Sequence, residues 1–172
     1  MAISKIPSAG FQDNVKFRNI IINGDMSIAQ RGTSVTGITG SGYYTVDRFR
    51  TLGASFGTFT QSQSTDVPTG QGFATSLKMD CTTANASLSS SSRLVVQQKI
   101  EGQNVQYLKK GTANAESLTL SFWVKSNKTG TYIAGIRDLD NARGISKSYT
   151  ISSADTWEKK TITFDGDTTG TL

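Results

Sequence analysis

The residues most able to do chemistry in this 172-residue chain are its acidic side chains, which are few and scattered. Asp138, Asp140 and Asn141 have the spacing with which a calcium-binding loop begins. The EF-hand pattern then requires an acidic or amide residue where Ala142 stands, a glycine where Arg143 stands, and a glutamate six residues later. All three are missing, so we predict a turn here. No pair of carboxylates stands out as the acid and base of a glycosidase.

Histidine is absent, and Cys81 is the single cysteine. Catalytic triads that depend on histidine are therefore excluded, and so is a disulfide within one chain. A zinc site would have to combine carboxylates with one thiolate, which is not a typical ligand set. Cys81 shares strand parity with Leu77 and Met79, which predicts a buried, small apolar residue. We therefore expect no enzyme activity, no catalytic residue, no metal ion and no cofactor.

Three aromatic residues are better candidates, and they indicate binding. Trp123 alternates out of phase with its apolar neighbour Phe122, and Trp157 is out of phase with the apolar Phe164. Together with Tyr132, these tryptophans could stack on a sugar ring or anchor an interface between subunits. The alternative is that their side of the sheet is a second buried surface.

Composition limits the class of protein. The chain carries a formal charge of +5, but its cations are scattered, with only Lys109-Lys110 and Lys159-Lys160 as pairs. No basic stripe interleaved with aromatic residues is visible, so we expect no nucleic-acid binding. No apolar run is long enough for membrane insertion, and the first ten residues lack the apolar core of a signal peptide. Abundant Gly, Ser and Thr between strand-like blocks predict one all-β domain.

The central element is expected to be a hairpin over Ser117–Asp138. The first strand would place four apolar residues on one face, namely Leu118, Leu120, Phe122 and Val124. Asn127–Gly130 would form the turn, and Thr131–Arg137 would return beside the first strand. Its apolar side must bury against a second layer, which predicts an antiparallel β-sandwich.

A second hairpin is predicted over Phe17–Gln30, because Asn23-Gly24 is a strong two-residue turn signal. Arg31–Gly42 is predicted to be a loop. The adjacent Asp47 and Arg48 would lie on opposite faces of a strand, so no ion pair between them is assumed. Further strands are expected over Tyr43–Leu52, Phe56–Ser62, Phe73–Thr82, Arg93–Glu101, Ile145–Ile151 and Trp157–Phe164.

The domain is expected to span residues 17–172, preceded by an extended N-terminal arm, Met1–Lys16, that attaches the protein to a larger assembly. An ordered terminus must be held by something. The apolar residues that could hold it are Ile3, Ile6, Phe11 and Val15.

Several blocks of the sequence, in one order, resemble a family of bacteriophage tail-fibre and related virion structural proteins. They are Asn19–Ser34, Tyr44–Phe49, Gln98–Asn104, Gly111–Asn114, Ser117–Ser126 and Trp157–Phe164. The resemblance covers nearly everything from residue 18 to residue 166 and includes no catalytic motif. It implies a jelly-roll, carbohydrate-binding-module-like sandwich. The family pattern continues with more strands beyond Leu172, so the fold is expected to be incomplete at its C-terminus or to continue past it.

The resemblance implies a virion structural protein, a tail fibre or fibre-like, that joins other virion proteins through the arm. It would be a homotrimer on the virion and would pass through the host cytoplasm during assembly. Host-surface glycan is the expected ligand. The alternative is a capsid decoration or head-fibre protein without a ligand, and a polysaccharide-degrading enzyme is the least favoured class.

Overall fold

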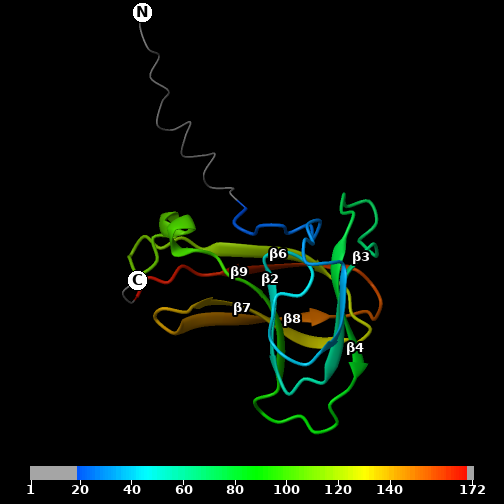
Figure 1. The fold of residues 1–172 in the computed structure, drawn as a ribbon. Coiled ribbons are helices and arrows are strands. Elements are labelled where there is room, and N and C mark those ends of the chain that lie inside the picture. Colours follow the sequence, from blue (N-terminus) through cyan, green and yellow to red (C-terminus); the bar gives the residue numbers. More distant parts are fainter. Residues whose placement is uncertain (1–18, 170–172) are drawn as a thin grey trace, which may run out of the picture.

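A computed structural model of the chain describes residues 19–169, which form an all-β fold of nine strands with two short 3-10 turns (Figure 1). The arm and its anchors Ile3, Ile6, Phe11 and Val15 lie outside the described residues. The strands are β1 (Ser34–Ile38), β2 (Phe49–Ala54), β3 (Thr58–Ser64), β4 (Ser76–Thr83), β5 (Arg93–Gln98), β6 (Leu118–Val124), β7 (Gly130–Asp138), β8 (Arg143–Ile151) and β9 (Glu158–Phe164). The 3-10 turns are η1 (Gly102–Asn104) and η2 (Gln106–Leu108).

The strands form four small sheets, with the orders β1-β3-β4, β2-β5, β6-β9 and β7-β8. Every pairing is antiparallel. The prediction of an all-β, antiparallel fold is therefore confirmed. The prediction that residues 31–42 form a loop is partly wrong, because they contain β1. Val35 and Ile38 of β1 pair with β3, and the Ile38 side chain is buried.

The predicted central hairpin is wrong in its pairing, although both of its strands exist. β6 pairs with β9, and β7 pairs with β8. The segment between β6 and β7 crosses from one sheet to the other, held by the Tyr132 hydroxyl, which donates to the carbonyl of Lys128 at 2.9 Å. The physical reason is burial: the two apolar faces cover each other when the strands lie in different sheets, and they could not do so side by side.

The inner faces of β6-β9 and β7-β8 meet through aromatic rings. Phe122 of β6 contacts Tyr149 of β8 edge-on, with ring centroids 5.1 Å apart. In Figure 1 the β6 and β9 ribbons run together above the β7 and β8 ribbons. Ile151, Ile162 and Phe164 are buried, which confirms that Ile162 and Phe164 point inward. Three of the eight buried apolar side chains of residues 19–169 therefore belong to this pair of sheets.

The remaining two sheets meet through a polar pair. Gln61 of β3 and Thr51 of β2 are both fully buried, and the Gln61 amide donates to the Thr51 hydroxyl at 3.4 Å. Cys81, expected to be buried, is exposed instead. β4 is an outer strand of its sheet, and its last residues have no second neighbour to cover them. Parity predicted the face on which Cys81 lies, but burial also depends on what covers that face.

Candidate functional site

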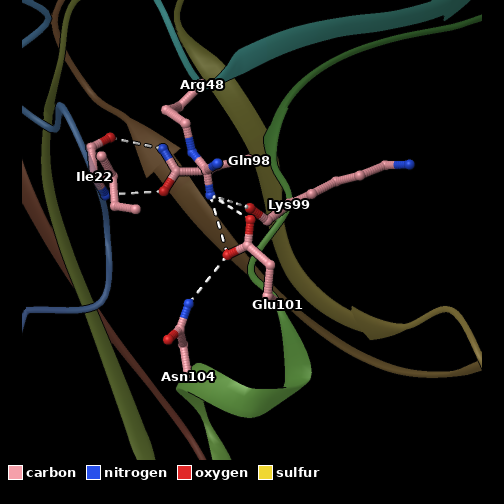
Figure 2. Close-up of polar contacts among 6 residues, drawn as sticks. All are labelled: Ile22, Arg48, Gln98, Lys99, Glu101 and Asn104. Atoms are coloured by element: carbon pink, nitrogen blue, oxygen red, sulfur yellow. Dashed lines mark hydrogen bonds and ion pairs between the residues drawn. The ribbon is translucent and has the colours of Figure 1, made fainter.

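The first described residues of the chain are held by a side chain of β5. The backbone N–H of Ile22 donates to the Gln98 side-chain oxygen at 2.9 Å, and the Gln98 amide donates to the Ile22 carbonyl at 2.8 Å (Figure 2). Gln98 thus satisfies both backbone groups of one residue, as a neighbouring strand would do. The segment that leads from the N-terminus is therefore fixed to the end of β5.

The hairpin predicted for Phe17–Gln30 is wrong, although its turn is present. Asn23 has a φ of 57°, and the N–H of Met26 donates to the Asn23 carbonyl at 3.0 Å. No strand flanks the turn among the described residues 19–30. The Asn23 side chain instead donates to the carbonyls of Ile28 and Asp47 and accepts from the Ile28 N–H, at 2.9–3.0 Å. Side-chain amides have taken the place of strand pairing.

A charged cluster lies beside this turn. Arg48 has a φ of 72°, and its guanidinium donates to the Glu101 carboxylate at 3.0 and 3.2 Å and to the Lys99 carbonyl at 3.2 Å. Asn104 donates to the same carboxylate at 3.2 Å (Figure 2). Asp47 pairs with Arg31 at 3.1 Å. Asp47 and Arg48 therefore have separate partners, as predicted. The prediction that they lie on opposite faces of a strand is wrong, because they form a turn and β2 begins only at Phe49.

We call these contacts the N-terminal junction, formed by Ile22, Asn23, Arg48, Gln98 and Glu101. It brings together three sequence blocks that are far apart in the chain, namely residues 19–34, 44–49 and 98–104. Sequence reasoning did not identify Asn23, Gln98 or Glu101 as contact residues. The adjacent opposite charges at residues 47 and 48 were the one available signal that this region needs two different partners.

The pKa of Glu101 lies below its ordinary value of 4.5. Its own backbone N–H and the Arg48 guanidinium donate to the ionised carboxylate and stabilise it. A carboxyl group with a lowered pKa stabilises the fold above its unfolded pKa, and that stabilisation disappears as the pH falls through the folded value. The junction should therefore weaken in acid.

Glu101→Gln tests this prediction. The free energy of unfolding should be lower than that of the wild type near pH 7, and the difference should shrink as the pH falls below about 4.5. Urea titrations at several pH values measure it. Arg48→Gln, which removes the positive charge and keeps the carboxylate, should have a deficit that also shrinks over this pH range, apart from the share due to the lost bond to the Lys99 carbonyl. A deficit of Glu101→Gln that is equal at neutral and acid pH would contradict the assignment.

A second candidate site is the outer face of β6-β9, which we call the tryptophan face. Trp123 lies directly opposite Lys159 in the strand register. Trp157 immediately precedes β9 with the parity of Lys159, so both tryptophans lie on the side away from the buried Phe164. Both are half-buried. Strand register and parity thus put on one face the two tryptophans that the sequence singled out.

One tryptophan is held in place by a charged pair. The Trp157 N–H donates to the Asp66 carboxylate at 3.0 Å, and the Lys125 ammonium lies 5.9 Å from the centre of the Trp157 ring. Lys125 also pairs with Asp66. Lys125, and after it the Trp157 N–H, lowers the pKa of Asp66. The Trp157 ring therefore has a fixed orientation and a cation beside it.

Tyr132 belongs elsewhere. Its ring stacks on Tyr149 with centroids 5.7 Å apart, and its hydroxyl shares a hydrogen bond with Ser126 at 3.1 Å. Tyr149 in turn contacts Phe122 between the two sheets. The three aromatic residues predicted as one set of ligand contacts therefore do not form a single platform, because Tyr132 lies on the inner side and the tryptophans on the outer side.

The described part of the chain, residues 19–169, contains no group of three or more Cys, Asp or Glu side chains placed to hold a metal ion. Within the same residues, no helix has the length and apolar character needed to cross a membrane. Comparisons of the chain with known protein families, with curated proteins and with solved structures found no match.

Proposed function

We propose that this chain is a structural protein of a bacteriophage virion, a tail fibre or fibre-like, joined to other virion proteins through Met1–Lys16. The N-terminal junction is the observation that carries the proposal. Hydrogen bonds of 2.8 and 2.9 Å fix Ile22 to Gln98 just after the arm. A domain that is attached through its N-terminus needs the segment that follows the attachment point to be fixed to its sheets. Three blocks of the resemblance to virion proteins meet in this junction.

We infer that the four sheets belong to a carbohydrate-binding-module-like β-sandwich of the jelly-roll type. Support comes from the facing of β6-β9 on β7-β8 through Phe122 and Tyr149, and of β3 on β2 through Gln61 and Thr51. Opposed small antiparallel sheets are how such sandwiches bury their inner faces. The protein would act without catalysis and without a cofactor.

The tryptophan face is the proposed contact with host-surface glycan. Half-exposed indole rings stack on sugars, and the Thr and Ser residues beside them can donate hydrogen bonds. Affinity per site would be weak, and a homotrimer would multiply it through linked binding. Tyr132 is a weaker candidate for contact with glycan, because its ring and hydroxyl already make contacts within the domain.

The location of the protein on the particle tests the main proposal. Labelled antibody against the folded domain should mark the tail of purified virions, with particles lacking the protein as the control. Label on the head would replace the proposal with the capsid-decoration alternative. Absence of the protein from washed particles would contradict both.

Binding to host-envelope polysaccharide tests the tryptophan face. Trp123→Ala should weaken binding of the single domain by about 2- to 10-fold, from ~0.5–1.5 kcal/mol for one aromatic contact. Trp123→Phe, which keeps an aromatic ring, should lose less, and Tyr132→Phe should bind as the wild type does. Surface-bound polysaccharide and a binding isotherm give the measurement. Equal binding by Trp123→Ala and wild type would remove the glycan from the proposal.

A further inference from the structure

Lys159 is the exposed cation of the tryptophan face. It lies directly opposite Trp123 in the register of β6 and β9. Side chains opposite each other on antiparallel strands have Cβ atoms about 5 Å apart, so the Lys159 side chain and the Trp123 ring are direct neighbours. Lys159 is exposed and forms no ion pair with another of residues 19–169. Its ammonium is therefore available to a ligand that lies on Trp123.

The two lysines closest to it in the strands already have partners. Lys125 pairs with Asp66, and Lys160, which has the opposite parity, pairs with Glu158. An ammonium whose charge is compensated by a carboxylate attracts a second anion only weakly. Lys159 therefore differs from both, because its charge is not compensated by the described part of the domain.

Lysine and tryptophan alternate diagonally on this face. Lys125 follows β6 and Trp157 precedes β9, so the strand register continues to place them opposite each other. The distance of 5.9 Å from the Lys125 ammonium to the centre of the Trp157 ring agrees with this position. The two tryptophans are then diagonal neighbours, roughly 7–8 Å apart. Each indole ring thus has an ammonium group on the neighbouring strand.

The remainder of the face is hydroxyl-rich and carries no carboxylate of its own. The outer positions between residues 119 and 125 and between 157 and 163 contain two lysines and no acidic residue. Asp66 reaches the face from another sheet and compensates one of the lysines. The other outer positions are exposed hydroxyl residues, namely Thr119, Ser121, Thr161 and Thr163. The face therefore presents aromatic rings, hydroxyl groups and one uncompensated positive charge.

These three features match one class of sugar. A uronic acid has an apolar ring face that can stack on an indole, hydroxyl groups around the ring, and a carboxylate attached directly to the ring. When its ring lies on Trp123, its carboxylate can reach the neighbouring Lys159. A neutral sugar would use the ring and the hydroxyl groups and leave the lysine without a partner.

We propose that the glycan bound by the tryptophan face is an acidic polysaccharide that contains uronic acids, with a sugar ring stacked on Trp123 and its carboxylate paired with Lys159. This inference rests on the proposed contact with glycan and specifies its chemical class. Charge complementarity carries it, because the outer positions of β6 and β9 offer cations and no competing carboxylate.

Binding of the full chain to paired polysaccharides tests the inference. The probes are alginate, polygalacturonate and hyaluronate, each compared with its carboxyl-reduced form, which keeps the linkages and loses the charge. The wild type should bind at least one acidic polymer about 2- to 5-fold more tightly than the reduced form, the range for one exposed ion pair. Lys159→Gln should bind both forms equally, and Lys159→Arg should keep the preference. Lys99→Gln is the matched control, because it removes the same charge from an exposed lysine just after β5.

The outcomes separate this inference from the glycan contact itself. Equal wild-type affinity for the acidic and reduced forms, or a preference that Lys159→Gln retains, would overturn the inference and leave the glycan contact in place. Unchanged affinity of Trp123→Ala for the acidic polymer would also overturn it, because the charge contact would then lie elsewhere. Binding of none of the polymers in either form would contradict both the inference and the glycan contact.

Discussion

Phe164→Ala is expected to lower the free energy of unfolding by about 3–5 kcal/mol, the range for truncating a well-packed aromatic residue. Phe164 is 1% exposed at the end of β9, and it lies opposite Leu118 of β6 in the register. Removing the ring would leave a cavity between β6-β9 and the sheet below it. Neither strand can collapse into that cavity, because each is held in a seven-residue ladder with the other.

Urea unfolding followed by fluorescence or circular dichroism measures this effect. Phe73→Ala is the matched control, because it makes the same substitution at an exposed phenylalanine and should cost less than about 1 kcal/mol. Phe164→Leu keeps most of the volume and should cost less than about 1.5 kcal/mol. If Phe164→Ala were as stable as Phe73→Ala, the burial of β9 against the second sheet would be wrong.

The faces of the strands could be predicted from the sequence because alternation is local. The phase of Phe122 and Phe164 against Trp123 and Trp157 identified an inner and an outer side, and the structure has both tryptophans on one outer face. Which strands pair could not be predicted in the same way. An apolar face looks the same whether its neighbour in sequence lies beside it or in a facing sheet, so β6 and β7 were taken for a hairpin.

The N-terminal junction was hidden for a different reason. Asn23 and Gln98 act through side-chain amides on distant backbone groups, and no periodicity records such contacts. The exposure of Cys81 could not be predicted from the sequence either. Its parity was read from the pattern, but its exposure depends on β4 being the outer strand of its sheet.

Asn23→Ala is expected to destabilise the domain by about 2–4 kcal/mol, from three lost hydrogen bonds at ~1 kcal/mol each plus unpaired backbone groups. The Asn23 side chain bonds to both Ile28 and Asp47, beside the backbone bond in which the Asp47 N–H donates to the Ile28 carbonyl at 2.9 Å. Alanine also tolerates the φ of 57° less well than asparagine does. Both effects act on the folded state, so they should add.

Two further variants separate these effects, and the free energy of unfolding again measures them. Asn23→Gly removes the hydrogen bonds and relieves the backbone, so it should lie between alanine and the wild type. Asn23→Asp keeps the acceptor for the Ile28 N–H and loses both donors, which leaves the carbonyls of Ile28 and Asp47 without this partner. Asn127→Ala, at an exposed position in the crossing after β6, should change stability by no more than about 0.5 kcal/mol. If Asn23→Gly were as stable as the wild type, the amide would not hold the turn, and the N-terminal segment would depend on its other contacts, such as those with Gln98 and Gln63.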